Sequence, residues 1–237
     1  MVRNRLGGVE EAWQMTVAAV LFDAYGTLID TKNGSVLATE AILRKNNSSL
    51  DAAEVYTIWK RYHRQHIDAL TSFIPESEVF LLVLKRIYRD YGINGNPEED
   101  VKIMLSILGA RQVFPETLHV VGKLRERYRI YIASTSDHEP LMSDLERNRL
   151  VVDRSFTSES VRAYKPKAEF YMRILEETGL RPEEAVFVGD SPVDDVLGPK
   201  SVGMKAAWIN RNNRPFPEEI PAPDYQLVDL NGLLSIL

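Results

Sequence analysis

Six apolar residues, Val17 to Phe22, run without a break and stop at Asp23, and this pattern constrains the fold most. A short, continuously apolar run is typical of a strand that is buried on both faces, as in parallel sheets. Three later runs have the same form: Ile130 to Ala133, Ala185 to Val188, and Lys205 to Ile209. Helical periodicity marks the segments 116–128, 139–149, 167–179 and 195–202. This alternation predicts an α/β fold with a doubly wound, Rossmann-like parallel sheet.

The stretch between the first two runs is helical by period and contains no comparable strand. Four helices are predicted there, at 36–45, 51–70, 75–91 and 97–108, the last with Pro97 at a favourable first-turn position. A chain of 237 residues has room for a second, smaller domain. We therefore expect an extension at 1–15, an α/β core formed by 16–33 and 113–237, and a helical cap at 34–112.

The composition excludes several classes of function. A net charge of -5 argues against general nucleic-acid binding, which needs clustered Lys and Arg. The chain has no cysteine, which excludes disulfides, thiolate metal sites and a cysteine nucleophile. No apolar run approaches the ~18 residues of a membrane span. We expect a cytoplasmic protein that acts on a small molecule; the sequence gives no sign of its oligomeric state.

Polar residues follow the apolar runs at the edge where parallel sheets bind their ligands. They are Asp23, Tyr25 and Thr27 after the first run, Ser134 after the second, and Gly189, Asp190 and Ser191 after the third, with Lys165 on a loop before Pro166. Each signal alone is weak, because Asp-x-x-Gly-Thr also describes turns and Lys-Pro often begins a helix. Their combination, in this order and each after a strand, is far more specific.

Four motifs of the chain resemble those of the haloacid dehalogenase superfamily, over about 16–237. They are FDAYGTL at 22–28, Ser134 after IYIA, Lys165 in AYKP, and VGDSPVDD at 188–195. The resemblance implies a hydrolase whose C1-type helical cap closes over the site and selects the substrate. It also implies roles for particular residues. Asp23 would be the nucleophile, Ser134 a hydrogen-bond donor to the transferred group, and Lys165 its charge partner.

The same resemblance implies a Mg²⁺ site and a set of substrate contacts. The metal ligands would be Asp23, the backbone carbonyl of Tyr25, Asp190 and either Asp194 or Asp195, with Asp195 favoured by the spacing. Mg²⁺ prefers one or two carboxylates together with substrate oxygens and water. A carboxylate nucleophile divides one hard displacement into two easier steps. The substrate contacts would be Thr27, Thr135, Lys60 and Tyr171.

Two positions point to different activities. Phosphatases of the superfamily usually carry a second Asp two residues after the nucleophile, whereas this chain has Tyr25, which resembles the 2-haloacid dehalogenases. Those dehalogenases have Ser-Ser-Asn where this chain has residues 189–191 and use no metal; without a cation, Asp190 would repel Asp23. We therefore favour a Mg²⁺-dependent phosphatase acting on a small phosphorylated metabolite. The alternatives are a metal-independent 2-haloacid dehalogenase and a non-catalytic binding protein.

Several residues also have simpler interpretations. Lys60, after Trp59, could correspond to the arginine with which the dehalogenases bind the substrate carboxylate, and Trp59 could equally be a core residue. Tyr171 aligns with a dehalogenase active-site tyrosine, with helix packing as the alternative. His63 and His66 have metal-binding spacing, but their polar neighbours favour an exposed helix face.

Overall fold

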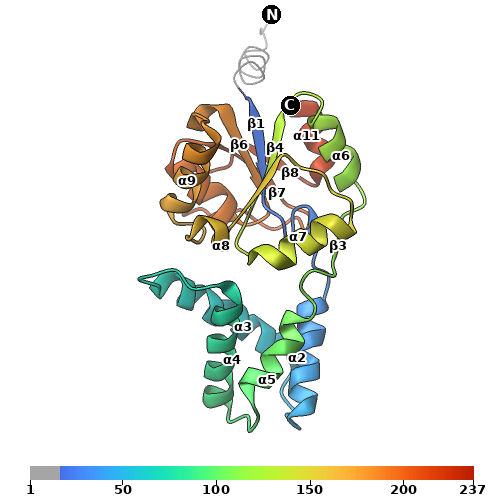
Figure 1. Ribbon diagram of the computed structural model, residues 1–237, viewed down its shortest axis with the longest axis vertical. Helices are drawn as coiled ribbons and strands as arrows, with labels where there is room; N and C mark the ends of the chain where they lie inside the picture. Colours follow the sequence, from blue (N-terminus) through green and yellow to red (C-terminus); the bar gives the residue numbers. More distant parts are fainter. Residues whose placement is uncertain (1–16) are drawn as a thin grey trace, which may run out of the picture.

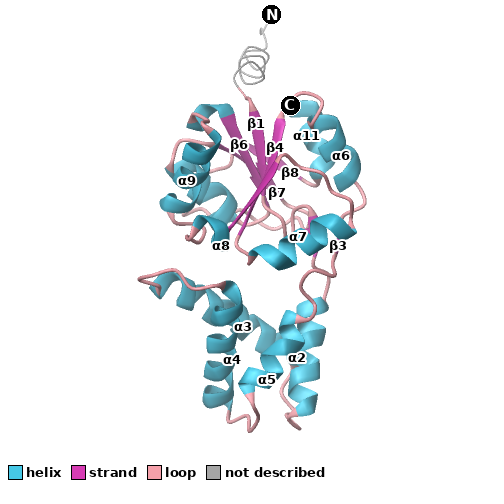
Figure 2. Cartoon of the chain, in the orientation of Figure 1, coloured by secondary structure: helices cyan, strands magenta, loops and turns pink. Residues whose placement is uncertain are grey.

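In the computed structural model, which describes residues 17–237, the chain forms two units (Figure 1). One unit is a parallel sheet with helices on both faces, and the other consists of helices alone, as the colouring of Figure 2 shows. The extension predicted at 1–15 lies outside the described residues. None of the helices within 17–237 combines the length and hydrophobicity needed to cross a bilayer.

The sheet has six parallel strands in the order β5-β4-β1-β6-β7-β8. Their bounds are β1 Ala19–Phe22, β4 Arg129–Ser134, β5 Arg154–Thr157, β6 Ala185–Gly189, β7 Lys205–Ile209 and β8 Tyr225–Leu227. The order reverses at β1, which pairs with β4 on one side and β6 on the other. This topology confirms the predicted doubly wound sheet and places the switch point at the end of β1.

Alternate side chains of β1 enter two different apolar cores. Val20 and Phe22 belong to the cluster that includes Leu124 of α6 (Thr117–Leu124). Ala19 and Leu21 belong to the cluster on the other face, with Phe170 of α9 (Ala168–Thr178). Because successive side chains of a strand point to opposite faces, both faces need apolar residues. This requirement explains the unbroken apolar run.

The remaining core elements include some that the sequence pattern did not predict. They are α7 His138–Arg147, α8 Ser158–Val161, the 3-10 turns η1 Pro182–Glu184 and η3 Leu230–Gly232, the π-helix η2 Pro192–Leu197, α10 Gly198–Ser201 and α11 Leu233–Ile236. The segment expected as one helix at 195–202 is thus a π-helix continued by α10. Strands β5 and β8 were missed because each is short, lies at an edge of the sheet and contains polar residues.

Helices α2 (Gly34–Lys45), α3 (Ala52–Ala69), α4 (Glu76–Tyr91) and α5 (Pro97–Leu105) form the second unit, which we call the cap. Its apolar core is separate from those of the sheet. Local signals fix the helix ends: Asp51 accepts a hydrogen bond from the Glu54 backbone N–H, and Gly92 ends α4 in the left-handed conformation. The chain enters and leaves the cap through a two-stranded antiparallel ribbon of β2 (Ile29–Asp30) and β3 (Gln112–Val113).

Polar contacts join the cap to the loops at the carboxyl ends of the strands. The carboxylate of Asp137, in the loop after β4, accepts hydrogen bonds from the first backbone N–H groups of α4, at 2.7 and 3.0 Å. An anionic side chain is favourable at a helix N-terminus. From α3, the Arg64 guanidinium donates to Asp194 and to the Lys165 carbonyl. The cap is therefore held over the edge of the sheet where the predicted site lies.

Candidate active site

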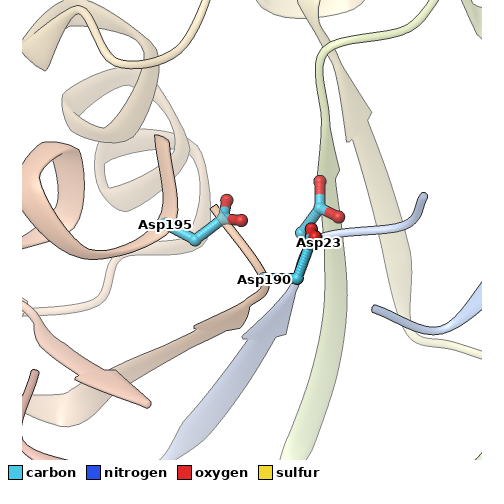
Figure 3. Close-up of side chains that lie close together, drawn as sticks. All are labelled: Asp23, Asp190 and Asp195. Carbon is cyan, nitrogen blue, oxygen red and sulfur yellow. The ribbon is translucent and has the colours of Figure 1, made fainter. Parts of the chain in front are cut away.

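Three carboxylates gather at the switch point of the sheet (Figure 3). Asp23 and Asp190 follow the adjacent strands β1 and β6, and Asp195 comes from η2. One oxygen from each lies within 4.8 Å of the others. Strand pairing alone brings the first two together, because Phe22 and Val188 are in register.

Lys165 supplies the positive charge that holds two of these carboxylates. Its Nζ lies 2.8 Å from Oδ1 of Asp23 and 2.9 Å from Oδ1 of Asp195, and the side chain is only 1% exposed. Burial acts to lower the pKa of Lys165, but the two carboxylates outweigh it and raise the pKa above its ordinary value. The ammonium therefore stays charged at any physiological pH.

One ammonium does not neutralise three carboxylates. Burial, followed by repulsion from Asp23, raises the pKa of Asp190 from 3.8 to about 6, although Arg214 and Lys165 act to lower it. Burial also raises the pKa of Asp195, against the opposing effect of Lys165. Arg214 is peripheral, at 3.8 Å from Asp190 and half exposed. The site therefore has an excess of negative charge, which a divalent cation would offset.

Two glycines allow the carboxylates to approach the backbone. A Cβ at Gly189 would lie 2.2 Å from the Asp195 carboxylate carbon, so no side chain fits there while Asp195 keeps its place. Gly26 has φ of +95°, and a Cβ there would lie about 3 Å from the Asp190 carboxylate. The glycines of both motifs are thus required by the geometry of the cluster.

The free oxygens of the cluster fit a cation. Oδ2 of Asp23 is buried and has no hydrogen-bond partner among the described residues. Asp195 instead has both oxygens occupied, by Lys165 and by the Ser191 backbone N–H at 2.9 Å. Asp194 lies outside the cluster and pairs with Arg64. Asp23 and Asp190 therefore offer free oxygens to a cation, and Asp195, which belongs to the same cluster, stays a predicted ligand.

Tyr25 occupies the position at which phosphatases of the superfamily usually carry a second Asp. Its hydroxyl points to a buried carboxylate. It donates a hydrogen bond of 2.9 Å to Oδ2 of Asp144. Burial and then the charge of Asp144 raise the pKa of Tyr25 far above its ordinary value. The hydroxyl is consequently a poor proton donor for a departing group.

A cavity of about 380 Å³ lies between the cap and the core. The core lines it with Tyr25, Thr135, Ser136 and Asp194, and one face of α3 lines it with Tyr56, Trp59, Lys60, His63, Arg64 and Ile67. Asp23 itself is 7% exposed and is not among the lining residues, but Tyr25, two residues after it, and Asp194, next to Asp195, are. The cavity is thus positioned to hold the part of a substrate beyond the reacting group.

The structure separates the sequence-predicted contacts into two groups. Lys60 and Thr135 line the cavity, and Ser134 is buried at the end of β4. Thr27 and Tyr171 were predicted to bind substrate, but both side chains are fully buried away from the cavity wall. Ser134 and Lys165 are buried to nearly the same degree and do not line the cavity either, so substrate contact by Thr27 and Tyr171 stays a prediction.

Tyr171 has a structural position beneath the site. Its hydroxyl donates to the Asp194 carbonyl, and its ring packs edge-on against Phe187 of β6. Gly198 makes room for it, since a Cβ there would lie 2.2 Å from the hydroxyl oxygen. Tyr171 therefore supports the η2 turn that carries Asp195.

Sequence reasoning also misplaced His63 and overlooked two residues beside Tyr25. His63 was expected on an exposed face, yet it lines the cavity, with Nε2 3.4 Å from the Glu76 carboxylate of α4. Asp144 and Arg111 flank Tyr25 and were not predicted. Nothing in the local sequence distinguishes them, because each meets Tyr25 only through the tertiary fold.

A family model, curated proteins and solved structures all match this chain. Residues 17–203 match the family model of the haloacid dehalogenase-like hydrolases. (S)-2-haloacid dehalogenase 4A of Burkholderia cepacia is 24% identical over 229 residues, covering 94% of this chain and 95% of its own. The phosphoserine phosphatase of Thermus thermophilus is 28% identical over 185 residues, covering 73% and 70%.

Two solved structures share the fold over nearly the whole chain. The HAD-hydrolase YfnB from Bacillus subtilis, solved bound to magnesium, has a TM-score of 0.80 at 20% identity and covers 93% of this chain and 98% of its own. The L-2-haloacid dehalogenase from Xanthobacter autotrophicus has a TM-score of 0.76 at 20% identity, with the same coverage. At these identities the likeness speaks for the fold alone.

Replacing Asp190 by Asn should stabilise the metal-free protein at neutral pH. The pKa of Asp190 is raised from 3.8 to about 6 on folding, so the folded state holds more protons between these values. Stability therefore falls as pH rises through that window, and the full penalty remains above it. Such a shift corresponds to about 3 kcal/mol in a fully buried group. Screening at a side chain 35% exposed reduces this to about 1 kcal/mol.

Thermal unfolding without metal, at pH 7.5 and at pH 4.5, measures this effect. The Asn variant should unfold at a higher temperature than the parent at pH 7.5, and the difference should shrink at pH 4.5. Asp194→Asn is the matched control, because it removes an ion pair with Arg64 and should lower the unfolding temperature. Equal effects of the two variants would contradict the charge imbalance.

Proposed function

Because the chain belongs to the haloacid dehalogenase-like hydrolase family, we propose that it is a Mg²⁺-dependent phosphohydrolase acting on a small phosphate monoester. The observation that carries the proposal is the carboxylate of Asp190 beside Asp23, with a single buried ammonium between three acids. A site that already has excess negative charge would repel a phosphate dianion. A divalent cation removes that obstacle, and the free oxygens of Asp23 and Asp190 suit it.

The bound cation would supply charge neutralisation for the transferring phosphoryl group. The residues of the chain would supply the nucleophile and hold it in position. Lys165 fixes Oδ1 of Asp23 at 2.8 Å and leaves Oδ2 without a hydrogen bond. The nucleophile is thus held in one orientation before substrate arrives, which lowers the entropic cost of the reaction.

The reaction proceeds in two displacements at phosphorus. A carboxylate oxygen of Asp23 bonds to phosphorus as the ester P–O bond breaks, and the leaving alkoxide or phenoxide takes a proton from water. Water then hydrolyses the resulting aspartyl phosphate, which releases inorganic phosphate and restores Asp23. The Lys165 ammonium offers its charge to the phosphoryl oxygens throughout, because phosphoryl transfer depends on positioning and charge.

The site lacks an effective acid to protonate the leaving group. The Tyr25 hydroxyl is bound to Asp144, and its raised pKa makes it a poor acid. General acid catalysis is worth ~10²- to 10⁴-fold. The leaving groups of aryl and acyl phosphates depart without needing a proton. These compounds should therefore be better substrates than alkyl phosphates.

The relatives support both this activity and a second candidate. The Thermus relative is named for a phosphate ester, and the Bacillus structure was solved with magnesium. The Burkholderia relative is a 2-haloacid dehalogenase, and Tyr25 favours that chemistry because a halide leaves without a proton. Gly189 argues against it, since the Ser found there in the dehalogenases would clash with Asp195.

Hydrolysis of p-nitrophenyl phosphate with and without Mg²⁺ tests the proposal. We expect turnover that requires the metal and that falls by at least about 10³-fold in Asp23→Asn, because the amide keeps the shape but not the nucleophile. Chloride release from 2-chloropropionate without metal would instead establish the dehalogenase. Absence of both activities on broad phosphate and haloacid panels would favour a non-catalytic binding protein.

Replacing Tyr25 by Asp should raise kcat on ethyl phosphate by at least about tenfold relative to Tyr25→Phe. Both variants lose the hydroxyl and its bond to Asp144, but only Asp restores a proton donor beside the nucleophile. On p-nitrophenyl phosphate the two should differ much less, because that leaving group needs no proton. No difference on ethyl phosphate would disprove the view that leaving-group protonation limits this enzyme.

A further inference from the structure

Arg111 is a cation of the cavity wall without an anionic partner. Its guanidinium carbon lies 4.8 Å from the centre of the Tyr25 ring, and it forms no ion pair with any residue of 17–237. The other guanidinium of the cavity, that of Arg64, is paired with Asp194. Arg111 is only partly buried, so its guanidinium is accessible to a ligand that enters the cavity.

A buried carboxylate holds Arg111 in place. Asp144 is fully buried, and its Oδ1 accepts a 2.7 Å hydrogen bond from the Arg111 backbone N–H while its Oδ2 accepts the Tyr25 hydroxyl. The Asn148 side chain donates 2.8 Å to the Arg111 carbonyl. One acid thus fixes both the backbone of residue 111 and the ring against which its guanidinium stacks. The site is organised before any ligand binds.

The remaining charges of the cavity do not cancel that of Arg111. Glu76 faces His63 at 3.4 Å, and Asp194 faces Arg64. Lys60 on the cap has no ion pair among the described residues either, and contacts the Tyr56 ring. Among the lining residues, three cations (Lys60, Arg64 and Arg111) stand against two carboxylates (Glu76 and Asp194), so the wall carries one more cation than anion.

We propose that Arg111 binds a carboxylate of the substrate, so that the enzyme selects phosphate monoesters that also carry a carboxylic acid. This inference rests on the proposed function and assigns its substrate class. The planar guanidinium matches a carboxylate with two parallel hydrogen bonds. One guanidinium balances the single charge of a carboxylate. A second phosphate dianion would need more positive charge than Arg111 supplies.

The rest of the wall indicates the body of such a substrate. Trp59, Phe80, Met104 and Leu108 add apolar surface to a cavity of about 380 Å³. This volume is near the lower end for ligand sites. A compact organic acid, with an apolar or aromatic body between its two anionic groups, fits both the size and the lining.

The proposal also accounts for Tyr25. Its ring provides the surface for Arg111, and its hydroxyl shares the anchor at Asp144. An aspartate at position 25 would offer no ring for the guanidinium. The residue that departs from the phosphatase pattern thereby acts as a positioning residue for substrate selection.

Two matched substrate pairs test the inference, with Mg²⁺ present: phosphoglycolate against ethyl phosphate, and 4-carboxyphenyl phosphate against phenyl phosphate. In each pair one member lacks the carboxylate. For every substrate, kcat and KM are measured for the parent, Arg111→Gln and Arg111→Lys. The anchoring hydrogen bond to Asp144 comes from the backbone, so these variants retain it, and circular dichroism confirms their fold. Lys60→Gln is the control, because it removes an equal charge from the same cavity.

We expect the parent to prefer the carboxylated member of at least one pair. Arg111→Gln should lower kcat/KM for that member about 10- to 100-fold more than for its partner, chiefly through KM. Arg111→Lys should recover part of the loss, and Lys60→Gln should cause a much smaller change in preference. Equal losses within each pair, or equal effects of the Arg111 and Lys60 variants, would overturn the inference and leave the phosphohydrolase intact. Failure of the parent to hydrolyse any of the four phosphates would overturn both.

Discussion

The ammonium of Lys165 between two buried carboxylates is the interaction on which the site depends. It touches Asp23 from β1 and Asp195 from η2, so it joins elements more than 160 residues apart in the chain. Removing one partner of such a pair leaves an uncompensated buried charge, which is far more costly than the pair itself. The same contact fixes the orientation of Asp23, the proposed nucleophile, and it leaves Asp190 as the acid that no buried cation neutralises.

The sequence predicts the part of this arrangement that depends on local pattern. Continuous apolar runs identified the central strands, and the residues that end them, Asp23 and Asp190, come together because parallel strands align their carboxyl ends. The edge strands β5 and β8 lack that pattern, since one side of each is unpaired. For Tyr171 the sequence left substrate contact and helix packing open, and only the fold shows that its hydroxyl donates to the Asp194 carbonyl. Arg111 could not be found at all, because its partner ring lies 86 positions away and no motif links them.

The cap is connected to the chemistry through the same helix face that lines the cavity. Arg64 of α3 lies one turn from Lys60, yet it reaches the core at Asp194 and at the carbonyl of Lys165. Any rearrangement that opens the cap must break these contacts and the bonds from α4 to Asp137. Access to the cavity and the environment of Lys165 are therefore physically coupled, as expected of enzymes that exclude water by closure.

Position 25 shows how one side chain can shift the balance between reaction rate and substrate selection. A proton donor there would serve every alkyl ester alike. Tyr25 does not provide such a proton donor, because its hydroxyl donates to Asp144 and its ring contacts the Arg111 guanidinium. Binding energy from a carboxylate remote from phosphorus can compensate for a slower chemical step only if it also orients the ester on Asp23. The proposed role of Arg111 meets that condition, because Asp144 and Asn148 hold its backbone in place, and it favours selectivity over breadth.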